Sequence, residues 1–393
     1  MSHTCPSLRS TFRSTFRSTF RSTFRSTFPS TFQPTFRHLA LAAAALCAAQ
    51  GAHAQSITLY GVADAGIEYL THADANNHSL ARVTSGNLSG SRWGMRGTED
   101  LGGGLQALFV LEGGFDIDSG TASQGGRLFG RQAYTGLSSQ YGRVTLGRQN
   151  NILYDILINY DAMAVSPRYS IFTMDTFTAG RYDNAAKYVG KFGGLTVSGL
   201  YSFARGTSLS GGTFGSEVPG NPKSDRAMSG GLEYNAGNVG VTVIYDMQQG
   251  TSGLAGQNPS QKDQRLAVAG TYTFSNAKLF AGYRWLNGNI GATAALPSKR
   301  ADLFWIGAGY QLTPALSLSG AGYLLNGRNG NGDAWSASVL LDYAFSKRTD
   351  VYAQVAYIRN DDTSRIGLNG PATTIGPAGT NQLGALVGMR HKF

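Results

Sequence analysis

The chain has 393 residues, of which 53 are glycine and 14% are charged, and its formal net charge at pH 7 is +10. Globular chains usually contain about 25% charged residues and about 7% glycine, so this chain is poor in charge and rich in glycine. Its longest uninterrupted apolar run, residues 39–49, is much shorter than the ~20 residues of a transmembrane helix, which excludes a helical membrane bundle.

The position of the positive charge argues against a nucleic-acid partner. Six arginines and no acidic residue precede residue 55, most of them in Ser-Thr-Phe-Arg repeats. The apolar run 39–49 and an Ala-His-Ala site ending at Ala54 follow, and this order is typical of a secretory signal peptide. Its basic region is unusually long, so an upstream start codon that adds a translated repeat is an equally good interpretation. Either way, we expect residues 1–54 to be cleaved and residues 55–393 to form the mature domain.

Little in the mature chain points to catalysis. Both cysteines, Cys5 and Cys47, lie in the segment to be cleaved, so a disulfide framework and cysteine-based metal or redox chemistry are excluded. Only three histidines remain, which is little for a zinc site or a Ser–His triad. We therefore expect no enzymatic activity, no cofactor and no metal site.

After residue 55 the sequence consists of short segments in which residues alternate with period 2, which predicts β-strands. In residues 277–288, for example, Leu279 and Tyr283 share one face, and Lys278 and Arg284 share the other. The sixteen predicted strands cover residues 56–71, 89–98, 105–115, 129–138, 143–150, 185–191, 195–205, 227–234, 239–248, 263–274, 278–287, 301–311, 316–326, 334–345, 350–360 and 382–393.

The connections between these segments alternate between short turns and longer, more polar loops. In an up-and-down meander this places the short turns at one end and the long loops at the other, as in outer-membrane barrels with short periplasmic turns and long external loops. The longer connections include residues 72–88, 116–128, 151–184, 206–226, 249–262, 288–300 and 361–381.

A closed sheet is the only β-structure that satisfies every backbone donor and acceptor in lipid. A sandwich would bury one face of each sheet in a dry core, yet the polar face here carries arginines such as Arg92, Arg131 and Arg284, which require water. The sequence therefore predicts an all-β fold, a 16-stranded antiparallel transmembrane β-barrel.

Several short motifs make the sequence resemble the Gram-negative general porins, in particular the beta-proteobacterial type, over essentially all of residues 55–393. The motifs are Ser-Ile-Thr-Leu-Tyr-Gly at 56–61, Ser-Gly-Ser-Arg-Trp-Gly at 89–94, Gly-Thr-Glu-Asp-Leu-Gly at 97–102, Phe-Gly-Arg-Gln-Ala-Tyr at 129–134, Thr-Leu-Gly-Arg-Gln at 145–149 and the terminal Phe393.

The resemblance implies a homotrimer in the outer membrane of a Gram-negative cell, with one aqueous diffusion pore in each barrel. It also implies contact with outer-membrane lipid and lipopolysaccharide. The terminal Phe393 resembles the signal that the outer-membrane assembly machinery recognises. Small hydrophilic solutes and ions would be the cargo.

Loop 151–184 is unusually long and rich in aromatic residues, so it must pack against something. We expect it to fold into the barrel and narrow the pore, as it does in the family. The alternative is a loop that lies on a neighbouring subunit or over the barrel mouth.

In the family, arginines at the positions of Arg92, Arg131 and Arg148 form a basic ladder on the barrel wall, facing acids on the inward loop. A transverse field of this kind selects solutes by charge and dipole. Arg96 and Glu112 are further candidates, and the candidate loop acids are Asp155, Asp161 and Asp175. The loop lacks the Pro-Glu-Phe-Gly-Gly motif of enterobacterial members, so which aspartate faces the ladder stays open. The alternative for each arginine is an ordinary solvated side chain in the lumen.

The sequence thus predicts a general porin for passive diffusion of small hydrophilic solutes, with charge selection at a constriction. The excess of arginine over lysine points to a mild anion preference, but the sequence does not decide whether the channel prefers anions or cations. The alternatives are a substrate-specific porin and a barrel that acts mainly as an adhesin or structural outer-membrane protein.

Overall fold

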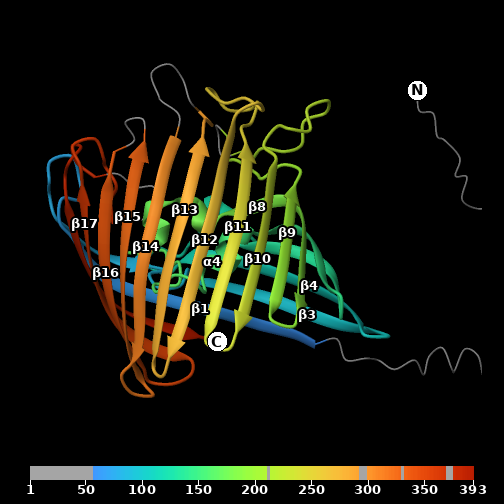
Figure 1. Ribbon diagram of the computed structural model, residues 1–393, viewed down its shortest axis with the longest axis horizontal. Coiled ribbons are helices and arrows are strands. Elements are labelled where there is room, and N and C mark those ends of the chain that lie inside the picture. The colour runs from blue at the N-terminus through green and yellow to red at the C-terminus, as the bar shows by residue number, and fades with distance from the viewer. Residues whose placement is uncertain (1–55, 210–212, 292–298, 329–331, 369–374) are drawn as a thin grey trace, which may run out of the picture. The chain divides into compact units, whose positions relative to one another are not determined.

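The computed structural model describes residues 56–209, 213–291, 299–328, 332–368 and 375–393. The predicted signal peptide, residues 1–54, lies outside the described residues. Sixteen long strands form the wall of a barrel (Figure 1). They are β1 (Ser56–Leu70), β3 (Arg92–Gly102), β4 (Leu105–Asp116), β6 (Gln132–Ser139), β7 (Gly142–Asn150), β8 (Arg181–Phe192), β9 (Leu195–Ser202), β10 (Ala227–Ala236), β11 (Val239–Gln249), β12 (Lys262–Phe274), β13 (Ala277–Gly288), β14 (Lys299–Gln311), β15 (Leu316–Arg328), β16 (Ala334–Ala344), β17 (Thr349–Asn360) and β18 (Gln382–Lys392).

The sheet is closed and antiparallel throughout. Each wall strand pairs with its neighbour in the chain, and β1 pairs with β18 from Val62 opposite Lys392 to Leu70 opposite Gly384. Each of the sixteen predicted segments corresponds to one wall strand, so the predicted 16-stranded antiparallel barrel is confirmed. Closure leaves no open sheet edge facing lipid.

Two further strands are short. The strand β5 (Thr121–Ala122) pairs with the end of β4, and β2 (Leu80–Ser85) continues the line of β3 along β1. Val62 of β1 lies opposite Arg92 of β3, and Ala65 of β1 lies opposite Ser85 of β2. Residues 86–91 therefore face only two residues of β1 and form a bulge in the wall strand made of β2 and β3. The carboxylate of Asp64 accepts hydrogen bonds from the backbone N–H groups of residues 88 and 89 at 2.9 and 2.7 Å and thereby holds the bulge in place.

Side chains alternate between the two faces of the wall. On β11, for example, Val241, Val243 and Tyr245 are exposed on the outside, whereas Ile244 and Asp246 are buried on the inside. The outer face is therefore an apolar band, as lipid contact requires, and the inner face carries the polar and charged groups.

The connections differ at the two ends of the barrel. Tight turns join the strands at one end, here the turn end, and longer connections join them at the other, the loop end (Figure 1). The helical elements are short: α3 (Ser123–Gly126) follows β5, and α4 (Ile152–Leu157), α5 (Ile171–Met174) and the 3-10 helix η2 (Thr176–Ala179) lie between β7 and β8. None of the helices among the described residues is long and apolar enough to cross a membrane.

Candidate functional site

The long connection between β7 and β8, residues 151–180, folds into the barrel, as the sequence predicts. In Figure 1 its helix α4 lies within the ring of strands. The first turn of α4 is capped by the Asn151 side chain, which accepts a hydrogen bond from the Tyr154 N–H at 2.9 Å. Ile152 and Ile156 then pack onto Gly231 of β10, where a Cβ atom would lie only 2.8 and 2.5 Å from them. A glycine on the inner wall thus makes room for the helix.

The connection, called the constriction loop below, is also anchored on other strands around the ring. Trp305 of β14 donates a hydrogen bond to the Tyr160 carbonyl oxygen at 2.9 Å. Tyr323 of β15 donates to Asp161 at 2.7 Å. On the far side of the loop, Tyr169 donates to Glu68 of β1 at 2.8 Å. These contacts carry the loop across the lumen from β10 to β1.

Asp161 belongs to this set of anchors. Its side chain is buried, at 2% exposure, and it also accepts a hydrogen bond from the Val165 N–H at 2.9 Å. Burial raises the pKa of Asp161 above its usual range, because its partners among the described residues are neutral donors. Asp161 therefore fixes the loop rather than facing the water-filled passage.

Asp175 is the anchor on β12 and β13. One of its carboxylate oxygens lies 3.0 Å from Nε of Arg265 and 3.1 Å from Nε of Arg284. The other oxygen accepts the Phe177 N–H at 3.1 Å, which caps η2. Burial opposes the charged form, but the two guanidinium groups outweigh burial and hold the pKa of Asp175 below its usual range.

Asp155 is the most accessible of the three predicted loop acids, with 35% of its side chain exposed. It forms an ion pair with Lys187 of β8 and accepts a hydrogen bond from Asn150 at 3.0 Å. Within the described part of the chain, none of the three loop acids forms an ion pair with Arg92, Arg96, Arg131 or Arg148.

Three of the predicted arginines, Arg92, Arg131 and Arg148, instead meet acids on their own side of the barrel. Glu112 of β4 accepts Arg131 Nε at 2.7 Å and the Tyr60 hydroxyl at 3.0 Å, and Arg92 Nε lies 3.6 Å away. Arg131 passes directly over Gly90 in the bulge, where a Cβ atom would lie 2.8 Å from the guanidinium. The Gly-Ser-Arg motif therefore places Arg92 and makes space for Arg131.

Arg148 sits at a second irregularity. The register between β7 and β8 shifts between Gly147 and Gln149, and Gly147 has φ +129°. Such a bulge redirects the intervening side chain, and only glycine adopts this conformation without strain. Arg148 donates to the Gly130 carbonyl at 2.7 Å and pairs with Asp183 at 2.5 Å.

Three cations near this site were not among the predicted residues. Arg127 pairs with the same Asp183 at 2.7 Å, and Lys187 holds Asp155. Arg181, at the start of β8, lies 5.6 Å from the centroid of the Tyr154 ring and interacts electrostatically with Arg131 and Arg148. The nearness of Arg181 to the basic ladder depends on the path of the loop, which local sequence patterns do not give.

Arg96 lies nearer the turn end than Arg92 on the same strand. Its side chain is exposed, and its guanidinium lies 5.2 Å from the centroid of the Tyr60 ring. Tyr60 in turn donates its hydroxyl to Glu112 at 3.0 Å, so this ring lies between Arg96 and Glu112.

We call Arg92, Arg127, Arg131, Arg148 and Arg181 together the basic wall. These five arginines come from one side of the ring, on or next to β3, β6, β7 and β8, and the carboxylates that they contact are Glu112 and Asp183. Among the described residues, this side of the ring thus carries more arginines than carboxylates.

Phe393 lies at the seam of the barrel. Its backbone N–H and carbonyl pair with Gly61 of β1 at 3.1 and 2.9 Å, beyond the last strand residue of β18. The ring packs over Gly61, where a Cβ atom would lie 2.3 Å from it. The C-terminal residue thus completes the β1–β18 ladder at the turn end.

Comparisons with known proteins agree with this architecture. The family model for Gram-negative porins matches residues 40–363. An outer membrane porin protein of Bordetella pertussis is 30% identical over 397 residues, which cover 90% of this chain and 99% of that protein. Outer membrane porin protein 32 of Delftia acidovorans is 30% identical over 373 residues, which cover 90% of this chain and 99% of that protein.

Among solved structures, an anion-selective porin from Comamonas acidovorans is similar with a TM-score of 0.73 and 26% identity, covering 86% of this chain and 100% of that one. The fold, the inward loop and the relatives agree with one another. This chain therefore belongs to the Gram-negative porin family, and it is an outer-membrane channel protein.

Proposed function

We propose that this porin favours small anions and anionic solutes at the constriction, and that the basic wall provides the preference. The observation that supports this proposal is the excess of arginines over carboxylates along one side of the passage. The similar porin from Comamonas acidovorans is anion-selective, which supports the same sign of selectivity for this chain. The proposal assigns no catalytic step and no cofactor to the chain.

In this proposal the basic ladder consists of Arg92, Arg131 and Arg148, and Arg181 extends it. Arg96 contributes less because it lies further toward the turn end. Asp155 is the loop acid best placed to face the water, because it is only partly buried. Asp161 and Asp175 act as anchors that hold the loop at a fixed distance from the basic wall.

We further propose that the channel is a homotrimer and that Phe393 is the residue that the assembly machinery recognises. The position of Phe393 supports the second point, since this residue is 48% exposed even though its backbone closes the seam. A terminal residue at the turn end would be accessible to the assembly machinery before the barrel closes between β1 and β18.

The test is the reversal potential of the purified protein in a planar bilayer under a salt gradient. Replacing Arg92, Arg131 and Arg148 singly by Glu should move the reversal potential toward cation preference. Each exchange should change the anion-to-cation permeability ratio by about two- to five-fold, because unit charges ~4 Å apart in water interact by about 1 kcal/mol. Arg348→Glu, in an exposed turn between β16 and β17, makes the same charge change away from the constriction and is the matched control.

Unchanged selectivity in all three ladder variants would refute the assigned role. Conductance that saturates with one solute would favour a substrate-specific porin. Absence of any conductance from correctly folded protein would contradict both channel functions and favour the adhesin or structural alternative.

A further inference from the structure

The constriction loop carries an unused hydrogen-bond donor to the inner wall. Tyr160 is only 2% exposed, yet its hydroxyl has no hydrogen-bond partner among the described residues. Trp305 of β14 holds the backbone carbonyl of Tyr160, so the residue has a fixed place in the barrel. A buried hydroxyl without a partner is unfavourable, so it points to a partner that the chain itself does not supply.

The Tyr160 hydroxyl lies at Gly240 of β11, where two more oxygen atoms converge. A Cβ atom at Gly240 would lie 3.2 Å from this hydroxyl. The same Cβ atom would lie 2.7 Å from Asn235 Oδ1 and 2.8 Å from Thr271 Oγ1, on the neighbouring strands β10 and β12. Because glycine has no side chain, three oxygen atoms surround one place on the wall. Asn235 is the exposed member of this group and can rotate aside to admit a ligand.

Two opposite charges flank these oxygen atoms. Glu233 of β10 accepts a hydrogen bond from Asn235 Nδ2 at 2.8 Å, which leaves Asn235 Oδ1 to accept from a ligand. Lys278 of β13 donates to the Asn159 carbonyl oxygen at 3.2 Å, next to Tyr160 in the chain. Within the described part of the chain, neither Glu233 nor Lys278 forms an ion pair. Both side chains are partly exposed, so each keeps charge that a solute can reach.

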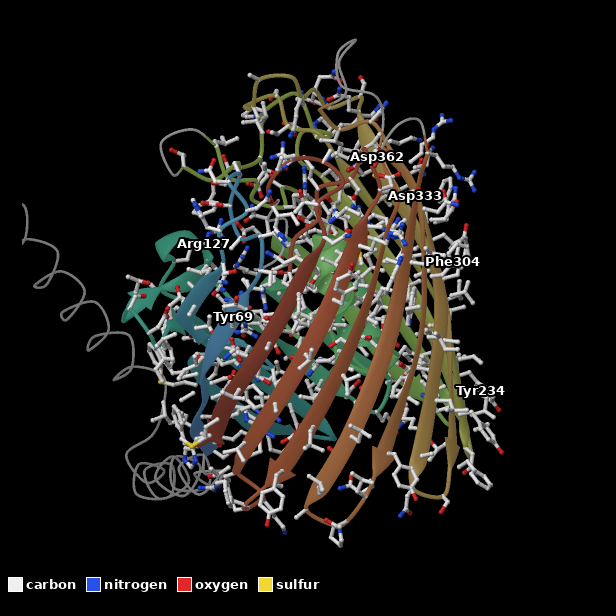
Figure 2. The ribbon with its side chains drawn as sticks, turned by 90° about the vertical axis from the view of Figure 1, so that its left-hand side faces the viewer. Tyr69, Arg127, Tyr234, Phe304, Asp333 and Asp362 are labelled. Carbon is white, nitrogen blue, oxygen red and sulfur yellow. The ribbon has the colours of Figure 1, made fainter. Side chains whose placement is uncertain are left out.

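The group faces the lumen on the turn side of the constriction loop. Helix α4 packs onto Gly231 of β10, and Glu233 and Asn235 follow Gly231 on the same face of the strand. The intervening Leu232 and Tyr234 are exposed on the outside, and Figure 2 shows Tyr234 on the outer side of the wall near the turns. A solute that has passed the constriction therefore meets the group on its way to the periplasmic end.

We call Tyr160, Glu233, Asn235, Thr271 and Lys278 the inner-wall cluster. Its two sides differ in chemistry: Glu233 and Asn235 Oδ1 accept on β10, whereas Lys278 and the Tyr160 hydroxyl donate toward β13. Three strand spacings of ~4.8 Å separate these strands, or about 14 Å. Side chains that extend inward from both strands leave room between them for a small molecule only. A matching ligand carries an ammonium group and a carboxylate a few bonds apart.

We propose that the inner-wall cluster binds zwitterionic solutes of the α-amino acid class. The ammonium group donates to Glu233, Asn235 Oδ1 and Thr271 Oγ1. The carboxylate accepts from Lys278 and the Tyr160 hydroxyl, and such charge-assisted hydrogen bonds are the stronger kind. A water molecule would satisfy the oxygen atoms at Gly240 but would leave both charges unpaired, so it accounts for only half of the cluster.

The inference rests on the channel function, because a solute must enter the lumen to reach the cluster. It is independent of the anion preference, since the basic wall lies on or next to β3, β6, β7 and β8 and the cluster lies on β10 to β13 with Tyr160. Reversal potentials report the basic wall and solute binding reports the cluster, so the two proposals can fail separately.

The experiment uses the full-length mature protein in a planar bilayer, with L-alanine as the probe. Alanine that binds briefly in the lumen should add current noise that rises with its concentration and then saturates. Propionate carries the carboxylate alone and alaninamide the ammonium group alone, so each is a matched half of the probe. Noise that either half produces elsewhere in the lumen should be the same in the parent and in variants of the cluster.

Tyr160→Phe removes only the unpartnered hydroxyl and should weaken alanine binding about two- to tenfold. Thr271→Val loses one hydroxyl with little change of shape and should weaken it by a similar factor. Tyr234→Phe, its matched control, removes a hydroxyl from the outer face and should bind alanine like the parent.

A charge variant tests the carboxylate side. Lys278→Met should weaken alanine binding at least about tenfold, because a charge-assisted contact is lost. Lys191→Met makes the same change at an exposed position near the turn end of β8 and should have no effect.

Equal alanine noise in Tyr160→Phe and Tyr234→Phe would overturn the proposal. A conducting parent without alanine-dependent noise would also overturn it, because the oxygen atoms at Gly240 would then hold water only. If Tyr160→Phe weakens propionate binding as much as alanine binding, the cluster is a plain anion site and the role of Glu233 is wrong. If Lys278→Met leaves alanine binding unchanged, the carboxylate side of the site is wrong.

Discussion

Glu112 sets the charge balance of the basic wall. It is 4% exposed, and its two carboxylate oxygens are shared between Arg131, Arg92 and the Tyr60 hydroxyl. The carboxylate lowers the repulsion between the two arginines and, if the proposed anion preference holds, cancels part of the field behind that preference. Structure and selectivity therefore make opposite demands on this one residue.

We predict that Glu112→Gln increases anion preference. The amide keeps the shape and most of the hydrogen bonds, but the basic wall gains one unit of net positive charge. The anion-to-cation permeability ratio should rise about two- to five-fold, on the same electrostatic scale as above. Reversal potentials in a planar bilayer measure the change.

Asp74→Asn, in an exposed external loop, removes the same charge far from the constriction and should change the ratio little. Because breaking one side of a buried ion pair costs about 3–5 kcal/mol, the thermal midpoint of the barrel on a denaturing gel must be compared first. A folded Glu112→Gln variant with the selectivity of the parent would contradict the role of Glu112.

At the residue level, motifs singled out Arg92, Arg131 and Arg148 as candidates, because each stands in a short segment whose spacing sets its strand and face; Glu112 was a further candidate outside these motifs. Asp183 and Arg181 could not be assigned in that way. Their contacts depend on where a thirty-residue connection returns to the wall, and local periodicity carries no information about that path.

At the level of elements, the constriction loop combines an apolar helix with polar anchors. Its length and aromatic content predicted that it would be packed, and the inward position is confirmed. Its anchors were not predictable, because each partner is distant in sequence: Asp161 bonds to Tyr323, 162 residues away, and Tyr169 to Glu68, 101 residues away. The barrel brings these residues together only when the sheet closes.

We predict that the Asp175 anchor makes the loop sensitive to acid. Because its folded-state pKa is depressed, the anchor is fully present above the usual range of aspartate, whose ordinary value is 3.8, and is lost as the pH falls through the lower folded value. Protonation would leave Arg265 and Arg284 close together without their shared counter-ion. We expect brief closures and extra current noise in single-channel records only as the pH falls through this depressed pKa, with quiet channels at neutral pH.

Asp175→Asn should show the same noise at neutral pH and no further change in acid. Asp155→Asn removes the same charge from the same loop but leaves the Asp175 anchor intact, so its noise should resemble that of the parent. If Asp175→Asn is as quiet as the parent at neutral pH, another contact holds the loop.

At the level of the whole molecule, the alternation of polarity and of connection lengths was sufficient to predict all sixteen wall strands. The sequence pattern predicted a loop over residues 72–88 and a strand from residue 89, and so missed β2 (Leu80–Ser85) and the bulge at residues 86–91, whose Gly-Ser-rich sequence resembles an ordinary loop end. Only the register shows that the same wall strand continues on both sides, and that the bulge contains Gly90 beneath Arg131.

Closure of the barrel leads to the final prediction. A Cβ atom at Gly61 would lie 2.3 Å from the Phe393 ring and 2.7 Å from the Arg92 carbonyl oxygen, so the seam cannot accept a side chain without moving backbone. Overpacking of this kind costs about 1–3 kcal/mol. Gly61→Ala should therefore lower the temperature at which the folded barrel is lost on a denaturing gel. Gly199→Ala, on β9 with no atom within 4 Å of the added Cβ, should leave that temperature unchanged. Equal midpoints for the two variants would mean that the seam adjusts freely and that the ring of Phe393 does not fix the β1–β18 junction.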